Sequence, residues 1–285
     1  MTMATCIPLS VALRDAVQKL TSANVGSPRL NAETLLMFTL DCDRAYLYAH
    51  SERELTTDEL RRYEEVLAER ASGVPAQYIT GHQEFWGMDL LVSPAVLIPR
   101  PETEHVVEVV LELSGGRGAL RIVDVGTGSG CIALAVAREL PDSEVHATEI
   151  SPAALEIAKS NAVRHQLEDR IQFHEMDLLA GLPSEQFDFV VSNPPYIPES
   201  EGEGLEAQVR KFEPHAALFA GEDGMAVYER LIPQAATVLK DDGWLVLEIG
   251  FGAADKVRRL LHGWQDVRVV NDLQQIPRVI AARPQ

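Results

Sequence analysis

Apolar residues recur at helical spacing through the first 75 residues, and a capping signal precedes each of three such runs. Ser10 stands before the first run, Asn31 before the second, and Thr56 with Glu59 forms a capping-box pattern before the third. A Gly-Val-Pro sequence at 73–75 ends the last helix. The pattern predicts a small helical bundle over residues 1–75, which is either a docking element for a protein partner or a stabilising appendage.

Residues 76–98 have a different pattern of apolar and polar residues, with short β-like runs separated by glycine. They predict a linker hairpin that turns near Gly81 or Gly87. Phe85 and Trp86 are expected to be packing residues of this linker rather than groups that stack on a substrate.

Helical and strand patterns alternate in the remaining residues, 99–285, which we interpret as a second domain. Such alternation implies βαβ units and a mostly parallel sheet with helices on both faces, an α/β fold. The last two strands are joined only by Asn271 to Pro277, so they should pair antiparallel. The predicted helices lie near 103–114, 129–140, 151–166, 221–240 and 253–263, and the predicted strands near 121–125, 144–149, 171–175, 187–192, 243–249, 267–270 and 278–283.

A glycine-rich turn joins the first of these strands to a helix, in the order Gly126-Thr127-Gly128-Ser129-Gly130. Glycines at this point let a ligand approach the backbone closely. The spacing departs from the dinucleotide fingerprint, because Cys131 stands where its third glycine belongs, and no P-loop lysine follows. Glu149 ends the next strand at a position suited to two ribose hydroxyls, unless it is simply an exposed strand-end charge.

A second loop, Ser192-Asn193-Pro194-Pro195-Tyr196, directly follows an apolar strand at the sheet edge where α/β folds bind ligands. Its asparagine offers a carbonyl acceptor, and its prolines lack backbone N–H donors. Tyr196 offers a flat face for stacking. The loop suits a planar amide or amino nitrogen, although proline-rich turns also cap strands without any further role.

Together the two loops resemble the motif series of S-adenosylmethionine-dependent methyltransferases that modify amino or amide nitrogens. The segment from Val96 to Glu104, with its Arg-Pro-Glu-Thr-Glu sequence, resembles the HemK/PrmC family of release-factor glutamine methyltransferases. The resemblance covers nearly the whole chain, with Glu149 where many relatives have Asp. It implies a seven-stranded Rossmann-like methyltransferase sheet with one reversed strand, preceded by a helical bundle.

The resemblance also implies roles for residues of both loops. S-adenosylmethionine is the expected cofactor, and the glutamine of the Gly-Gly-Gln motif of class-1 release factors is the expected substrate. We hypothesise that the Asn193 side-chain carbonyl and the Pro194 backbone carbonyl accept the two amide hydrogens while Tyr196 stacks on the amide plane. Substrate binding is assigned to Asn193, Pro194, Pro195 and Tyr196, and cofactor binding to Gly126, Thr127, Gly128, Ser129, Gly130, Glu149, Asp177, Leu178 and Asn193.

Composition narrows the possible functions. The chain carries a formal charge of −18, of which residues 76–285, with 17 basic and 32 acidic side chains, contribute −15. Direct binding of nucleic acid is therefore disfavoured, because phosphate contacts need clustered Lys and Arg. No apolar run is long enough for a membrane helix, and no secretory signal is visible. Three scattered cysteines, at positions 6, 42 and 131, suit a reducing cytoplasm and predict no metal site.

Three alternatives stay open: a glutamine methyltransferase acting on a ribosomal protein, a DNA adenine-amine methyltransferase, and a cofactor-binding module without catalysis. We expect a monomer. The acidic segment from Glu199 to Glu213 is expected to be mobile, with solvated carboxylates. Arg100 and Glu102 either close over the site or take part in a structural ion pair at the domain junction.

Overall fold

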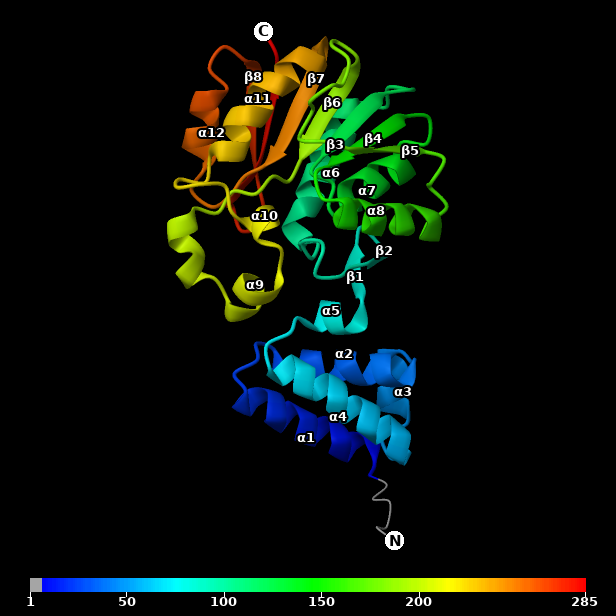
Figure 1. The fold of residues 1–285 in the computed structure, drawn as a ribbon. Coiled ribbons are helices and arrows are strands. Elements are labelled where there is room, and N and C mark those ends of the chain that lie inside the picture. The colour runs from blue at the N-terminus through cyan, green and yellow to red at the C-terminus, as the bar shows by residue number, and fades with distance from the viewer. Residues whose placement is uncertain (1–6) are drawn as a thin grey trace. The chain divides into compact units, whose positions relative to one another are not determined.

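The computed structural model describes residues 7–285, which form two compact units (Figure 1). The first unit comprises the residues up to Gly81 together with Glu206–Phe212. The second comprises His82–Leu205 and Glu213–Gln285. The domain boundaries expected from the sequence, after residues 75 and 98, stay a prediction.

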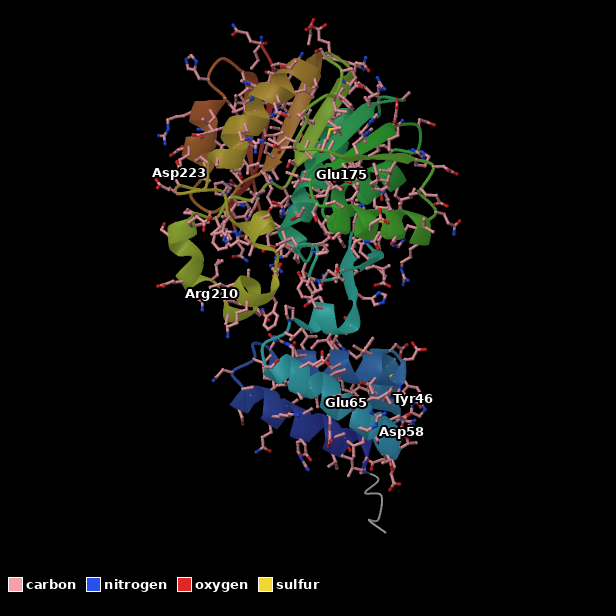
Figure 2. All side chains as sticks on the ribbon, in the orientation of Figure 1. Tyr46, Asp58, Glu65, Glu175, Arg210 and Asp223 are labelled. Atoms are coloured by element: carbon pink, nitrogen blue, oxygen red, sulfur yellow. The ribbon has the colours of Figure 1, made fainter. Side chains whose placement is uncertain are left out.

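The first unit is helical, as its periodicity predicts, and its apolar faces meet in one core that includes Leu20, Leu35 and Tyr63. The buried Tyr63 hydroxyl donates to the Ala32 carbonyl at 2.9 Å. Charged residues of α4, among them Asp58 and Glu65, extend into solvent (Figure 2). The helices are α1 (Leu9–Ser22), α2 (Pro28–Leu40), α3 (Arg44–Ala49), α4 (Thr57–Ala71), α5 (Ala76–Thr80) and α9 (Ala207–Phe212).

Only one of the three capping predictions is confirmed. Thr56 and Glu59 form a reciprocal capping box at the start of α4. The predictions for Ser10 and Asn31 are wrong, because α1 and α2 begin earlier, at Leu9 and Pro28. The Asn31 side chain nevertheless donates to the Gly26 carbonyl at 2.9 Å, so it supports the helix start from within the helix.

The second unit is built on a seven-stranded sheet in the order β5-β4-β3-β6-β7-β9-β8. All neighbouring pairs are parallel except those of β9, which runs antiparallel to both β7 and β8. The predicted sheet with one reversed strand is thereby confirmed. The strands are β3 (Arg121–Val125), β4 (Glu144–Glu149), β5 (Ile171–Glu175), β6 (Phe187–Ser192), β7 (Leu239–Glu248), β8 (Gln265–Asn271) and β9 (Pro277–Arg283).

Helices cover both faces of this sheet. Residues of α6, α7 and α8 pack on the face formed by Ile122, Ala147 and Phe189, and residues of α11 and α12 pack on the face formed by Val123 and Leu247. Strands buried on both faces have the near-continuous apolar runs seen in the sequence. The helices are α6 (Glu104–Ser114), α7 (Cys131–Glu139), α8 (Pro152–Arg164), α10 (His215–Leu218), α11 (Ala226–Val238) and α12 (Ala254–Leu260), with 3-10 turns η1 (Pro101–Thr103) and η2 (Glu199–Gly204).

The predicted hairpin is formed by β1 (His82–Phe85) and β2 (Met88–Leu91), which turn at Trp86 and Gly87. Phe85 is buried in the same core as α6, and Trp86 packs against that core, as expected for packing residues. The Asn161 side chain of α8 accepts from the Leu91 N–H at 2.7 Å and donates to the Leu91 carbonyl at 2.9 Å. The hairpin is therefore docked on the sheet domain.

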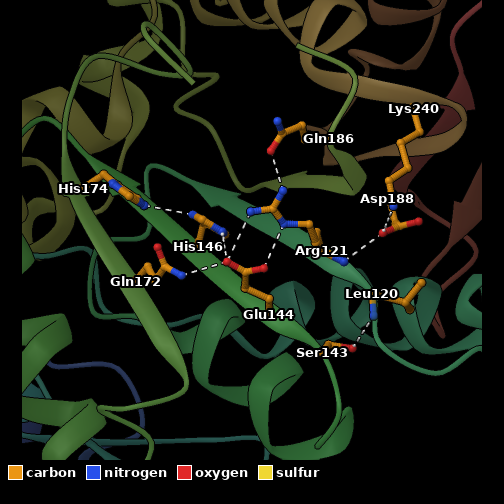
Figure 3. A network of polar contacts seen from close by, with 10 residues as sticks. All are labelled: Leu120, Arg121, Ser143, Glu144, His146, Gln172, His174, Gln186, Asp188 and Lys240. Atoms are coloured by element: carbon orange, nitrogen blue, oxygen red, sulfur yellow. Dashed lines mark hydrogen bonds and ion pairs between the residues drawn. The ribbon is translucent and has the colours of Figure 1, made fainter. Parts of the chain in front are cut away.

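A polar network joins the amino ends of β3, β4 and β6 and extends to His174 of β5 (Figure 3). The Arg121 guanidinium pairs with Glu144 at 2.9 Å, and the Arg121 N–H donates to Asp188 at 2.8 Å. His146 contacts Glu144 at 3.1 Å and His174 at 2.9 Å. Burial lowers the pKa of both histidines, so each is held neutral near pH 7. Arg121, Glu144 and Asp188 stand at the amino ends of their strands, opposite to the glycine turn, whereas His174 is the penultimate residue of β5.

Candidate active site

Strand register brings the glycine turn at 126–130 and the loop at 192–196 together. Val125 pairs with Thr148 on one side and with Ser192 on the other, and Ser192 pairs with Leu247. The next residue of each strand therefore stands at the same edge of the sheet, in the order Glu149, Gly126, Asn193 and Glu248.

A cavity of about 380 Å³ opens at this edge. Residues absent from the predicted site also line it, among them Thr103 and Arg230. Gly130, Pro194 and Tyr196, which the sequence also proposed, are not among the described residues that line the cavity. The proposed residues that do line it are Gly126, Thr127, Gly128, Ser129, Glu149, Asp177, Leu178, Asn193 and Pro195.

The glycines of the turn serve different purposes. Gly126 and Gly128 have φ values of +70° and +56°, and a Cβ added to either would meet no atom within 4 Å. Both therefore leave room beside the backbone on the cavity side. Gly130 instead allows close helix packing, because a Cβ there would lie 3.1 Å from the Leu134 Cδ1 and 3.3 Å from the Ala158 Cβ.

The buried carboxylate of Asp124 supports the glycine turn through hydrogen bonds. Asp124 is 1% exposed, and its Oδ2 accepts from the Thr127 hydroxyl at 2.6 Å and from the Ala133 N–H at 3.2 Å. Burial raises the pKa of Asp124 to about 7, against the effect of these two hydrogen bonds. Asp124 thus ties the turn to the first residues of α7.

Glu149 is buried and holds the turn from the side. One of its oxygens accepts from the Gly128 N–H at 3.0 Å, and the other accepts from the N–H groups of Ile150 at 2.8 Å and Ser151 at 2.9 Å. The alternative of an exposed strand-end charge is therefore wrong. A carboxylate has about four acceptor positions, so Glu149 retains capacity for a further donor from the cavity.

The cavity lining contains an ion pair that the sequence does not reveal. Arg230, from α11, forms an ion pair with Asp177 through its Nη2. Leu178, the next residue, has a φ of +53° and also lines the cavity. Arg230 occurs in an ordinary amphipathic helix, and only the fold brings it to the site.

Asn193 is connected to two buried residues, Thr103 in the cavity lining and Glu248, which is not among the described lining residues. Its Nδ2 donates to the Thr103 Oγ1 at 3.0 Å, and the Thr103 hydroxyl donates to the Glu248 Oε2 at 2.7 Å. Thr103 is 1% and Glu248 2% exposed. Burial is the main cause that raises the pKa of Glu248 to about 7. The site predicted from the sequence does not include Glu248. A carboxylate at the end of an apolar strand is nevertheless a signal of a buried, hydrogen-bonded group.

Tyr196 lies beside the cavity rather than in its lining. A Cβ added to Gly250 would come within 2.6 Å of its ring, so the ring packs directly against that backbone. Burial raises the pKa of the Tyr196 hydroxyl to about 12. This packing gives Tyr196 a structural role in holding the Asn-Pro-Pro loop, and the proposed stacking on a substrate stays a prediction.

Replacing Gly250 with alanine should therefore destabilise the sheet domain by about 1–3 kcal/mol, because the new methyl group must displace the Tyr196 ring. Chemical denaturation of the full chain measures this cost. Gly118→Ala is the matched control, since a Cβ there meets no atom within 4 Å. An equal loss of stability in both variants would contradict the close packing of Tyr196 on Gly250.

Arg100 forms a structural ion pair, one of the two alternatives considered for it. Its Nη2 lies 2.5 Å from the Glu213 Oε1, and Glu213 also accepts from the Ile98 N–H at 3.3 Å. Glu213 is 6% exposed, so its expected place among solvated carboxylates is wrong. The pair fixes the segment before η1 at the cavity rim, where Arg100 and Pro99 are lining residues.

Thiol and metal chemistry are not indicated at this site. Burial raises the pKa of the Cys131 thiol to about 12, so it stays protonated. Cys42 is a free thiol in the helical unit, and Cys6 lies outside the described residues. Within residues 7–285, no group of three or more His, Cys, Asp or Glu side chains is arranged to hold a metal ion.

None of the helices within residues 7–285 combines the length and apolar character needed to span a bilayer.

Solved structures share the fold at low identity. The catalytic domain of hMettl16, in complex with a MAT2A 3′UTR hairpin, aligns with a TM-score of 0.58 at 20% identity, covering 85% of this chain and 92% of that chain. A methyltransferase from Pyrococcus furiosus aligns with a TM-score of 0.51 at 18% identity, covering 78% of this chain and 98% of that chain. These likenesses establish a methyltransferase fold.

Sequence comparison is more specific. Residues 11–81 match the PrmC N-terminal domain, and residues 107–211 match the methyltransferase small domain. The release factor glutamine methyltransferase of Koribacter versatilis is 53% identical over 96% of this chain and 98% of its own length. That of Geobacter sulfurreducens is 41% identical over 93% of this chain and 92% of its own length. The chain therefore belongs to the release factor glutamine methyltransferase family.

Proposed function

We propose that this protein transfers a methyl group from S-adenosylmethionine to the side-chain amide nitrogen of the glutamine in the Gly-Gly-Gln motif of class-1 release factors. The observation that carries the proposal is the Asn193 amide, anchored through its Nδ2 at 3.0 Å, beside a glycine turn that lines the same cavity. The names of the relatives support the choice of substrate. A translation factor as substrate implies a cytoplasmic enzyme.

The residues present fit the cofactor. Open space beside the Gly126 and Gly128 backbone allows a close approach of its ribose and methionine part. Glu149 accepts hydrogen bonds from three backbone N–H groups and keeps one acceptor position, which suits a ribose hydroxyl. Asp177 and Leu178 would meet the adenine, with Arg230 holding the Asp177 carboxylate in place. The cofactor would supply a sulfonium methyl group that an in-line nucleophile attacks, with the thioether as the leaving group.

The chain must compensate for the weakness of an amide nitrogen as a nucleophile, since its lone pair is delocalised into the carbonyl. We assign the Oδ1 of Asn193, a lining residue, as one acceptor for the two amide hydrogens, and the backbone carbonyl of Pro194, which follows it directly but is not among the described lining residues, as the other. Both bonds strengthen as positive charge develops on the nitrogen, so they favour the transition state over the ground state. The amide nitrogen would gain the methyl carbon, the sulfur of the cofactor would keep the electron pair of the broken C–S bond, and the proton lost from the nitrogen would pass to water.

Positioning is the main contribution that this site offers. Holding a nitrogen in line with a methyl group lowers a barrier by about 7–11 kcal/mol in favourable cases. The cavity wall includes buried side chains, among them Thr103, Thr127 and Ser129, together with the glycine turn, and these would hold the two reacting groups in place. An acid or base in direct contact with the nitrogen is not required for this step, because the proton leaves after the positive charge has formed.

The test uses labelled S-adenosylmethionine with a class-1 release factor, ribosomal proteins and DNA in one mixture, followed by peptide mass mapping. We expect one methyl group on the glutamine of the Gly-Gly-Gln peptide. A release factor with that glutamine replaced by alanine is the control and should stay unlabelled. Label on a ribosomal protein or on DNA adenine, with none on the release factor, would overturn the proposal in favour of an alternative substrate.

A further inference from the structure

A buried acidic residue stands behind the cavity wall, with no direct place in the proposed chemistry. Glu248 ends β7 beside Asn193 and is not among the described residues that line the cavity. Burying a carboxylate is costly unless it is paired or hydrogen-bonded. Its hydrogen-bonded partner is the Thr103 hydroxyl, at 2.7 Å, and Thr103 in turn is bonded to Asn193. Through Thr103, Glu248 therefore acts on the orientation of the Asn193 side chain.

When Glu248 is ionised, the chemistry of these three groups fixes the direction of both hydrogen bonds. An ionised carboxylate only accepts, so Thr103 must give its single hydroxyl hydrogen to Glu248. The Thr103 oxygen can then only accept from Asn193, which requires the Nδ2 and not the Oδ1 to face Thr103. The Asn193 Oδ1 is therefore directed away from Thr103 and remains available to a ligand of the cavity that Asn193 lines.

We propose that Thr103 and Glu248 are positioning residues that hold the Asn193 side chain with its carbonyl oxygen available to the substrate amide. The positioning of Asn193 follows from the hydrogen-bond geometry alone. Its effect on turnover rests on the proposed function. We call the two hydrogen bonds from Asn193 to Thr103 and from Thr103 to Glu248 the relay. Without the relay, the asparagine amide can rotate by half a turn and present its NH2 group, which repels the amide hydrogens of a substrate. A neutral partner at position 248 would leave both orientations possible.

The relay depends on the charge of Glu248. Protonated Glu248 can donate to Thr103, whose hydrogen is then free to turn toward Asn193 and stabilise the flipped amide. Ionised Glu248 is the competent form, so turnover should rise with pH as this carboxyl loses its proton. Its pKa lies at about 7, raised by burial and by Glu102 and lowered by Thr103 and by the guanidinium groups of Arg278 and Arg100. The phenols of Tyr196 and Tyr228 also face it, and both stay protonated because burial raises their pKa.

Three variants and one control variant test the relay through turnover of release-factor methylation. Thr103→Val keeps the shape and removes the hydroxyl, and should lower kcat by about 10- to 100-fold with the Kd for S-adenosylmethionine unchanged within about twofold. Thr103→Ser should restore most of the lost kcat. Glu248→Gln should abolish the rise of kcat with pH near neutrality. Thr39→Val removes another buried threonine hydroxyl, bonded to the Leu35 carbonyl at 2.7 Å, and should leave kcat unchanged.

A measurement without substrate separates the relay from the proposed function. In ¹⁵N-labelled full-length protein, the Asn193 side-chain NH2 signal, identified by its absence in Asn193→Asp, should exchange slowly with water and shift with pH around a midpoint of about 7. Both properties should disappear in Thr103→Val, and the pH-dependent shift should disappear in Glu248→Gln. If these hold but no release factor is methylated, the function fails and the relay stands. Fast exchange in the wild type, or wild-type kcat and pH profile in Thr103→Val, would overturn the relay.

Discussion

Replacing Asn193 with alanine is expected to lower the turnover of release-factor methylation by about 100- to 1,000-fold, while the Kd for S-adenosylmethionine stays within about threefold. The reason is that its Oδ1 binds the substrate amide more strongly as the nitrogen becomes positive. The glycine turn and Glu149 are held by their own hydrogen bonds, to Thr148 and to backbone N–H groups, and do not depend on Asn193. The loss should therefore fall on kcat.

Single-turnover kinetics at saturating cofactor and calorimetric titration of the cofactor measure the two quantities separately. Asn271→Ala, on the exposed edge strand β8, is the matched control and should match the wild type in both. Equal kcat in Asn193→Ala and the wild type would remove Asn193 from the reaction. A loss confined to cofactor affinity would instead assign Asn193 to the cofactor alone.

The sheet could be predicted from the sequence because its signals are local. Apolar runs of strand length alternate with helical patterns, and the short connection after Asn271 allows only an antiparallel return. Predicting where the two loops lie also needs only the rule that ligands bind at the carboxyl ends of parallel strands. The register of Val125 with Ser192 then brings them side by side.

The supporting contacts of the site could not be predicted in this way, because they join residues far apart in the chain. Thr103 and Glu248 are separated by 145 positions, and Arg100 and Glu213 by 113. Composition around Glu213 indicates solvated acidic residues, and nothing local distinguishes this carboxylate from its neighbours. Its burial follows from the fold, which places it against Arg100.

Residues within one motif also differ in ways that spacing does not encode. Gly128 leaves open space at the cavity, whereas Gly130, two positions later, packs against α8. Asn193 lines the cavity, whereas the ring of Tyr196 packs on Gly250. A motif identifies the loop, but the direction of each side chain depends on the backbone angles and on what the neighbouring elements leave free.

Glu149→Gln is expected to weaken S-adenosylmethionine binding by about 100-fold and to lower the stability of the sheet domain by about 1–3 kcal/mol. Glutamine replaces one carboxylate oxygen by an NH2 group. That group would then face either the Gly128 N–H or the N–H groups of Ile150 and Ser151, so at least one buried donor loses its acceptor. Loss of charge also weakens the bonds available to the ribose hydroxyls.

Glu175 provides a matched control for this prediction, because it ends the neighbouring strand β5 in register with Glu149 but is exposed. Glu175→Gln should leave both cofactor affinity and stability unchanged, since an exposed strand-end carboxylate contributes little to either. Calorimetric titration and chemical denaturation of the two variants give the comparison. If Glu149→Gln bound cofactor as tightly as Glu175→Gln, the carboxylate would serve only the backbone turn, and the ribose hydroxyls would have to be bound by other acceptors of the cavity.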